Sequence, residues 1–368
     1  MKMTSTDISL LNTDILHIFN ILCDANPSNE SCTMDAVSIL NVLKYCYYAT
    51  GDKKRIDLDN NTKIKDILSI TPKAQNSRFG IFSRNDHRQN ITFKKEFEKQ
   101  IFIGYIPTDD KERRDINTSI KKNFPTSINN DKDFLPKSID RHVAFYVKDE
   151  SYFKGNWQVP FDERETRVAL FNCGDNESVM IPTMHAENVK GYRYYCKDLN
   201  LWAISLPYKE KYTMLILLPD NVMNKKELLS LCKDNFSRKI IEYISKQKEC
   251  IYNDVSMPKF DFKSEWQLNI NNIYDCDKVP YLSKILDHKT VDFTNMSNSL
   301  RYVEDIELMS VSSINNNESG TIVETETFLY AFDSHISNEL TLSIDKNFLY
   351  LILDNENIIN NIGIYLGD

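Results

Sequence analysis

The side chains that could carry out catalysis are spread along the chain without a recognisable catalytic spacing. None of the six histidines stands in an H-E-x-x-H or H-x-H arrangement, and no G-x-S-x-G turn presents a serine nucleophile. One short segment, Asp333-Ser334-His335, contains the three residue types of a hydrolytic triad. Adjacent side chains of an extended segment point to opposite faces, so these three cannot form the hydrogen-bond chain of a triad. The sequence therefore predicts a protein that is not an enzyme.

Phosphate, metal and cofactor sites are not indicated either. The chain has nine glycines, and no two are closer than four residues, which excludes the glycine-rich loops that cradle phosphates. Its eight cysteines show no C-x-x-C spacing and no nearby histidine that would complete a zinc site. We therefore expect no metal, no cofactor, and free thiols in a reducing compartment.

The charge of the chain argues against a polyanionic partner. Its 45 basic and 53 acidic residues give a net charge of −8, and the basic residues are scattered along the sequence. Nucleic-acid binding needs clustered Lys and Arg to neutralise phosphates, so it is not expected. The run Lys53-Lys54-Arg55 is followed by Asp57 and Asp59 and is interpreted as a solvated face.

The N-terminus predicts an intracellular, cytoplasmic protein. Residues 1–8 are polar and include Asp7, unlike a secretory signal, and no run of about eighteen apolar residues predicts a membrane span. Sequons of the N-x-[ST] type occur at Asn90, Asn176 and Asn235, but an Asn-rich chain produces them by chance. The missing signal favours an intracellular location without membrane contact, and secretion by another route is the alternative.

The elements expected around these residues are mainly helices first and strands later. Apolar spacing predicts helices at 7–24, 38–48, 93–99, 225–231 and 236–246, with helical spacing also within 109–131. Runs rich in β-branched and aromatic residues predict strands at 78–82, 142–147, 201–206, 212–219, 251–262, 324–332 and 348–353. Because regular β-α-β alternation and linkers rich in Pro, Gly or Ser are missing, we expect one α+β domain over residues 1–368.

A period-two pattern runs through residues 318–342. Its alternate positions form a small or β-branched face made of Thr321, Val323, Thr325, Thr327 and Leu329. The glutamates of this segment fall on the other face, and irregular polar residues follow at 333–339. By itself, the segment is typical of an edge strand that ends in a loop.

Ordered motifs between residues 142 and 367 carry a family resemblance. Residues 151–162 read S-Y-F-K-G-N-W-Q-V-P-F-D, and residues 318–321 read E-S-G-T. Further motifs follow at 180–184, 206–209, 214–220, 257–260, 291–294 and 348–352. In type and order these segments resemble the serpin family, whereas residues 1–141 match it weakly. The resemblance implies three β-sheets, about nine helices and an exposed reactive-centre loop, with loop and hinge at about 318–342.

The resemblance implies a protease inhibitor that acts as a suicide substrate. A protease cleaves the loop and forms an acyl-enzyme, and the loop then inserts as a new strand into the large sheet and distorts the protease. The hinge implied by the motif consists of Glu318, Gly320, Thr321, Val323 and Thr325. The family usually has alanines after the hinge, where this chain reads V-E-T-E at 323–326. The alternative is therefore a non-inhibitory serpin that acts as a binding or chaperone-like protein.

The bond offered to the protease is implied to be Asp333-Ser334. Counting forward from Gly320 gives Ser334, whereas counting back from Phe348 gives Ile336. The alternative positions are Phe332, His335 and Ile336.

The type of target protease follows from the residues of the loop. No Lys or Arg lies between Thr321 and Asp345, so a trypsin-like pocket, which needs a cation, is not expected. The expected target is an aspartate-preferring protease of the caspase or granzyme type, or a chymotrypsin-like enzyme that takes Phe332.

Three further regions are implied by the resemblance. Trp157 stands at the family's tryptophan position at the top of the large sheet. The family's polar cluster beneath the sheet corresponds to Asp35, Ser38, Asp149 and Ser310, and two buried carboxylates there would have to share a proton or find cations. The helix region 51–78 is shortened, so glycosaminoglycan binding is not expected. The implied protein is a monomer whose partner is a serine or cysteine protease.

Overall fold

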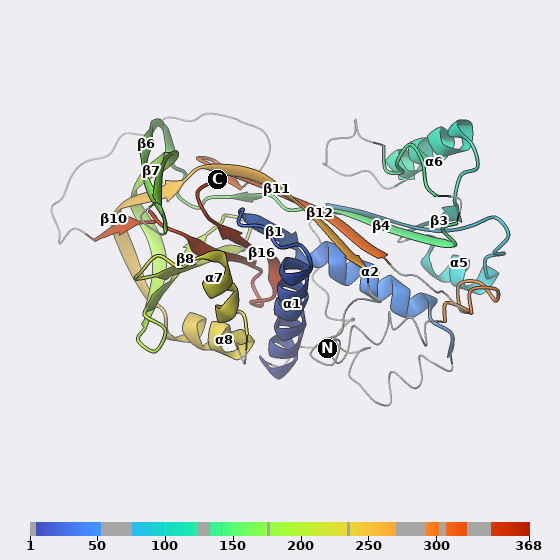
Figure 1. Cartoon of the computed structure of the whole chain (residues 1–368), viewed down its shortest axis with the longest axis horizontal. Coiled ribbons are helices and arrows are strands. Elements are labelled where there is room, and N and C mark those ends of the chain that lie inside the picture. The colour runs from blue at the N-terminus through green and yellow to red at the C-terminus, as the bar shows by residue number, and fades with distance from the viewer. Residues whose placement is uncertain are drawn as a thin grey trace. The chain divides into compact units, whose positions relative to one another are not determined.

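The structure of the protein is a computed structural model (Figure 1). It describes residues 5–52, 76–99, 101–123, 133–140, 142–174, 177–233, 236–269, 292–301, 307–321 and 340–368. The chain divides into two units, which are described separately. The first unit contains residues 1–36, 154–266 and 309–368, and the second contains residues 37–153 and 267–308.

The largest sheet of the first unit has nine strands in the order β1-β16-β15-β9-β8-β7-β10-β14, with β6 paired to β7. The strands are β1 (Cys32–Asp35), β6 (Asp162–Gly174), β7 (Glu177–Cys196), β8 (Leu201–Pro207), β9 (Thr213–Pro219), β10 (Lys248–Pro258), β14 (Thr341–Ser343), β15 (Phe348–Leu353) and β16 (Ile359–Tyr365). All residues of β15 and β16 are buried, including Asn360 and Asn361 of β16. The strands predicted at 201–206, 212–219 and 348–353 are confirmed.

Among its described residues, the first unit has three helices: α1 (Ser5–Ala25), α7 (Lys225–Leu231) and α8 (Phe236–Lys246). Helix α1 buries Leu11, Ile15 and Phe19 and packs against α8 and β16. Helix α7 begins with a capping box in which the side chains of Asn224 and Glu227 each accept a hydrogen bond from the other residue's backbone N–H. The helices predicted at 7–24, 225–231 and 236–246 are confirmed.

Helix α1 modifies the expectation about membranes. By length and composition, Thr6–Ala25 is apolar enough to span one, although no uninterrupted apolar run marks it in the sequence. In the structure 61% of its most apolar window is buried inside the protein. Such burial is typical of a core helix. Length and composition alone do not distinguish a core helix from a signal sequence near the N-terminus.

A four-stranded sheet has the order β11-β12-β13-β5. Its strands are β5 (Gly155–Asn156), β11 (Phe260–Asn269), β12 (Glu307–Asn317) and β13 (Gly320–Thr321). The single strand predicted at 251–262 is wrong, because β10 ends at Pro258 and β11 begins at Phe260. Between them, the N–H of Lys259 donates to the carbonyl of Pro182 at 2.9 Å, while β11 pairs in a different sheet from β10.

The described residues of the second unit form a three-stranded sheet and three helices. The strands, in the order β3-β2-β4, are β3 (Phe102–Tyr105), β2 (Asn76–Ser83) and β4 (Phe145–Tyr152). The helices are α2 (Ala36–Ala49), α5 (Ile91–Phe97) and α6 (Asp110–Asn123). A core of Phe82, Ile106, Ile120, Phe134 and Leu135 joins β2 to α6 and the segments beside them. The strand predicted at 142–147 begins only at Phe145.

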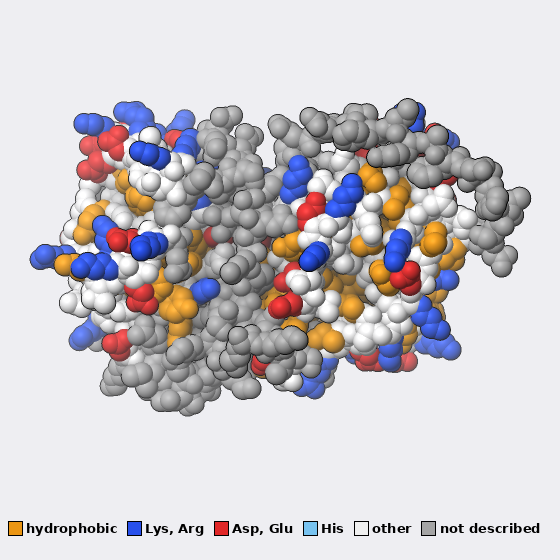
Figure 2. Space-filling model, turned by 180° about the vertical axis from the view of Figure 1, so that it is seen from behind, with side chains coloured by type: hydrophobic (Ala, Val, Ile, Leu, Met, Phe, Trp, Pro, Cys, Tyr) orange, Lys and Arg blue, Asp and Glu red, His pale blue; other side chains and the backbone are white. Residues whose placement is uncertain are grey.

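The predicted α+β class is confirmed: the described residues form three sheets and six helices. The long β6–β7 hairpin was not predicted, because its strands are exposed on both faces over much of their length and so lack a simple alternation. Val168, Leu170 and Met180 are 62, 57 and 63% exposed there. On the face shown in Figure 2, basic and acidic side chains are interspersed over the described surface.

Several sequence expectations lie outside the described residues. These are the strand at 324–332 and most of the shortened helix region 51–78. The single domain over 1–368 stays a prediction.

Candidate functional site: the hinge

The predicted hinge forms a short strand inside the four-stranded sheet. Strand β13 pairs antiparallel with β12, where Gly320 lies opposite Asn317. It also pairs antiparallel with β5, where Gly320 lies opposite Asn156. The first two residues after the β12 turn therefore have a strand on either side. We call residues 316–321, with the side chains that contact them, the hinge site.

Position 320 requires glycine because the backbones of β13 and β5 approach each other closely there. A Cβ atom at this position would lie 2.1 Å from the carbonyl oxygen of Gly155 and 2.7 Å from the Cα atom of Asn156. Any side chain would push β13 away from β5. The glycine of the predicted hinge motif thus allows the strand to enter the sheet.

Glu318 is a buried charge held by two partners. Its side chain is 5% exposed and accepts hydrogen bonds from Thr166 Oγ1 at 2.6 Å and from Lys259 Nζ at 2.9 and 3.0 Å. Burial of the carboxyl raises its pKa, but the hydrogen bonds from Thr166 and Lys259 outweigh burial and hold the pKa below its ordinary value. Glu318 is therefore ionised at neutral pH and fixes the turn to β6 and to the segment between β10 and β11.

The backbone of the turn is hydrogen-bonded to the segment around Trp157. The Trp157 N–H donates to the carbonyl of Ser319 at 3.0 Å, and its indole Nε1 donates to the carbonyl of Asn317 at 3.0 Å. The N–H of Phe161 donates to the carbonyl of Glu318 at 2.8 Å. Three consecutive carbonyls of the turn thus have partners, as buried backbone groups require.

An aromatic stack connects Trp157 to the first loop residue. The rings of Trp157 and Tyr208 are stacked at 4.4 Å, and the Tyr208 hydroxyl lies 2.8 Å from Thr321 Oγ1. Thr321 Oγ1 also donates to Asn316 Oδ1 at 3.4 Å. Burial raises the pKa of Tyr208, so its hydroxyl stays protonated and can donate. Thr321 is held by strands on both sides and by the tyrosine hydroxyl.

The hinge site unites Glu318, Gly320, Thr321 and Trp157, all of which the sequence singled out. Tyr208 and Lys259 were not assigned to it, although they stand in the motifs at 206–209 and 257–260. Asn316, whose side chain donates to the carbonyl of Pro258 at 3.0 Å, carries no sequence signal. The site holds a strand in place, and no group of His, Cys, Asp or Glu within the described part of the chain is placed to bind a metal ion.

The proposed cleavage positions lie outside the described residues. The cleavage positions are Phe332, Asp333, Ser334, His335 and Ile336. Two of the predicted hinge positions, Val323 and Thr325, also lie outside the described residues. The loop is described again from Leu340, whose N–H donates to Asn253 Oδ1 at 3.0 Å, and continues into β14. Both ends of the loop are thus anchored on sheets of the first unit.

The residues of the expected polar cluster are half-buried. The N–H of Asp35 donates to Ser312 Oγ at 2.9 Å, which joins β1 to β12 in the first unit near Ser310. In the second unit, Asn41 Nδ2 of α2 lies 3.5 Å from Asp149 Oδ1 of β4, and Ser38 is on the same helix. The cluster as a whole stays a prediction, because its members belong to two units.

These features define an α+β protein in which the segment before the loop is a strand within one sheet, and the segment after the loop is an edge strand of another. The model of the family described as Serpin (serine protease inhibitor) matches residues 35–365. The chain therefore belongs to the serpin family, whose members are in general protease inhibitors and not catalytic enzymes.

Individual relatives agree with this assignment. Alpha-1-antiproteinase S of Cavia porcellus is 25% identical over 63% of this chain, and the match spans 58% of the relative's length. The macrophage plasminogen activator inhibitor 2 of Mus musculus is 25% identical over 53% of this chain and 48% of its own. The chain thus matches only about half of these relatives' length.

Solved structures show the same fold. The crystal structure of Serpin48 from the insect Tenebrio molitor has a TM-score of 0.74 at 15% identity and covers 100% of both chains. Human thyroxine-binding globulin in complex with thyroxine has a TM-score of 0.71 at 15% identity over 98% of both chains. At such identities the likeness establishes the fold alone.

Proposed function

We propose that this serpin inhibits a protease by loop cleavage, acyl-enzyme formation and insertion of the cleaved loop into the four-stranded sheet. The observation that supports this proposal is the pairing of β13 with both β12 and β5. Because Gly320 and Thr321 already lie between two strands, further loop residues can extend the same antiparallel pairing. Insertion then continues an existing strand and needs no new nucleus.

The loop sequence supports insertion from this starting point. Thr321 is 4% exposed, so its side chain faces the buried side of the sheet. With a period of two, Val323 and Thr325 follow on the same face, whereas Glu324 and Glu326 fall on the other face. The inward positions are uncharged, and the two glutamates can stay in water.

The proposed target is an aspartate-preferring protease that cleaves after Asp333. A chymotrypsin-like protease that cleaves after Phe332 is the second possibility, and trypsin-like enzymes are not proposed because the loop lacks Lys and Arg. The proposed setting is intracellular, and the cysteines of the described residues are free thiols.

Incubation with a caspase, a granzyme B-type protease and chymotrypsin tests the proposal. We expect a complex of inhibitor and protease that resists boiling in detergent, and Asp333→Ala should abolish it for the aspartate-preferring enzymes only. Thr321→Arg places a charge at the entrance of the sheet and should give a cleaved loop without a complex. Cleavage of the unchanged protein by every protease without any complex would contradict inhibition.

A non-inhibitory binding serpin is the second candidate. The glutamates at 324 and 326 replace the small residues of typical inhibitors, and one structural neighbour, thyroxine-binding globulin, binds a small molecule. Heat resistance after loop cleavage separates the two candidates. Insertion of the loop adds a strand and should raise the melting temperature steeply, whereas a loop that never inserts leaves it unchanged.

A further inference from the structure

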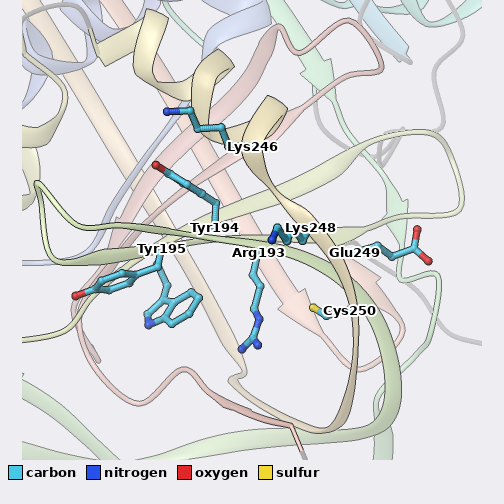
Figure 3. A pocket seen from close by; sticks show the side chains of 8 residues that line it. Arg193, Tyr194, Tyr195, Lys246, Lys248, Glu249 and Cys250 are labelled. Carbon is cyan, nitrogen blue, oxygen red and sulfur yellow. The ribbon is translucent and has the colours of Figure 1, made fainter.

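A basic and aromatic pocket of about 600 Å³ lies where β7, β8 and β10 meet the C-terminus of α8 (Figure 3). Its lining includes Arg193, Tyr194, Tyr195, Trp202, Lys246 and Lys248. The volume is within the range of small-molecule sites. The hinge site uses none of these residues, so the pocket has no role in the function proposed above.

Two cations of the pocket face each other across neighbouring strands. Strands β7 and β10 pair antiparallel, and Arg193 lies directly opposite Lys248. Residues in such positions place their side chains on the same face of the sheet, where like charges destabilise the pair. Lys248 is exposed, so water and salt screen part of this repulsion, and an anion between the two side chains would remove it.

The other lysines around the pocket already have acidic partners. Lys190 pairs with Glu249, with 3.0 Å between Nζ and Oε1, and Lys246 pairs with Glu242 one helical turn away. Glu249 is therefore not free to neutralise Lys248. Across the part of the chain that the structure describes, neither Arg193 nor Lys248 has a carboxylate partner.

Aromatic rings lie beside these two cations. Trp202 is opposite Tyr195 on the neighbouring strand, and their ring centroids are 4.9 Å apart. The guanidinium carbon of Arg193 lies 5.2 Å from the centre of the Trp202 ring. The Tyr195 hydroxyl donates a hydrogen bond to Asp220 Oδ2 at 2.5 Å. This bond fixes the Tyr195 ring and gives the Asp220 carboxylate a partner. Trp202 is only half-buried, so its ring is open to a ligand.

The charged and aromatic groups of the pocket are divided between the two sides of β7. Figure 3 shows Arg193 and Tyr195 on the side of the strand away from Lys246, whereas Tyr194 points toward Lys246. Tyr194 stacks on Tyr243 of α8 at 5.8 Å and belongs to the packing of that helix. The binding surface therefore consists of Arg193, Lys248 and the rings beside them.

We propose that this pocket binds a small organic anion in which a sulfonate, sulfate or carboxylate is joined to a flat aromatic body. The anionic group lies between Arg193 and Lys248, where charge-assisted hydrogen bonds replace the repulsion of the two cations. The flat body lies against Trp202 and Tyr195, which offer ring faces and edges.

Isothermal titration of the full chain with naphthalene-2-sulfonate tests the proposal. We expect one site per chain, and binding about tenfold weaker in Arg193→Gln and in Lys248→Gln, because each removes a charge-assisted hydrogen bond. Lys197→Gln removes an exposed cation next to β7 and should leave binding unchanged. The uncharged naphthalene-2-sulfonamide should bind at least about tenfold more weakly than the sulfonate.

Two further measurements separate binding from folding. Lys248→Glu removes the repulsion with Arg193, so it should raise the midpoint of thermal unfolding while it weakens sulfonate binding. Trp202→Phe should abolish the quenching of tryptophan fluorescence by the ligand and keep the stoichiometry, because Trp157 and Trp266 are buried. Equal affinity of the unchanged protein and Arg193→Gln, or several equivalent sites per chain, would overturn the proposal.

Discussion

Among the residues of the hinge site, Glu318 is the buried charge that connects the turn to two other segments. Its carboxylate is buried, its partners Thr166 and Lys259 come from separate segments, and its own carbonyl is bound by Phe161. The Lys259 side chain is 44% exposed and stays solvated without its partner, so the stabilisation comes from the charge-assisted hydrogen bonds that the buried carboxylate accepts. The residue thus keeps the turn before the loop in one conformation.

Glu318→Gln should lower the free energy of unfolding by about 2 kcal/mol at pH 7, since it weakens the charge-assisted hydrogen bonds from Thr166 and Lys259. Because the pKa of Glu318 is lowered in the folded protein, its contribution is present above the pKa of the unfolded chain and is lost as the pH falls through the folded pKa. Urea unfolding at pH 7 and at acidic pH measures both effects. The matched control is Glu265→Gln, an exposed carboxylate paired with Lys263, which should change little. An equal effect of the two substitutions would contradict the role of Glu318.

Asp14 is a second buried carboxyl, on helix α1. It is 2% exposed, its Oδ2 atom has no hydrogen-bond partner in the described structure, and burial raises its pKa to about 7. A folded pKa above the unfolded value favours the protonated form. Folding is therefore stabilised at low pH, and this stabilisation is lost as the pH rises toward and through 7.

Asp14→Asn should make the protein more stable at pH 8 than the unchanged chain, by on the order of a few kcal/mol, and the difference should shrink toward pH 4. Melting temperatures measured from pH 4 to pH 8 test this expectation. Asp24→Asn alters an exposed carboxylate of the same helix and serves as the control. A difference that is constant across this pH range would rule out titration of Asp14.

Among the elements, strand β13 holds the start of the loop between β12 and β5. Gly320→Ala should displace β13 from β5, because the added Cβ meets the Gly155 carbonyl, and it should cost about 1–3 kcal/mol. Hydrogen exchange at the amides of 316–321 should accelerate. Ser319→Ala, in the same turn, should leave the exchange slow. Unchanged protection in Gly320→Ala would show that the close approach of β13 and β5 is not needed.

At the scale of the whole molecule, both units are assembled from separate stretches of chain. The first unit uses three segments and the second uses two, so neither is one continuous piece of sequence that could fold before the other is synthesised. We expect a single unfolding transition, with coincident curves by calorimetry, far-ultraviolet circular dichroism and tryptophan fluorescence. Two separate transitions would contradict the single domain predicted over residues 1–368.

The sequence predicted the regular elements well where one periodicity dominates. Helices α7 and α8 and strand β15 have the predicted bounds, because their apolar residues repeat with a clear helical period or form a continuous buried run. Strands β6 and β7 escaped prediction because water covers parts of both faces. The break between β10 and β11 escaped prediction because apolar residues alternate with polar ones on both sides of Lys259, so no change of pattern marks the end of one strand.

For the hinge site, the sequence by itself determined the motif at 318–321, the tryptophan at 157 and, through them, the family of the protein. The tertiary structure alone decided what holds these residues. Thr166 and Glu318 are 152 positions apart, and Tyr208 and Thr321 are 113 apart. Local propensity and periodicity act over a few residues, so they cannot specify such pairs. Only the packing of distant strands, from two sheets, brings the buried carboxylate to its lysine and places Gly320 in contact with Gly155.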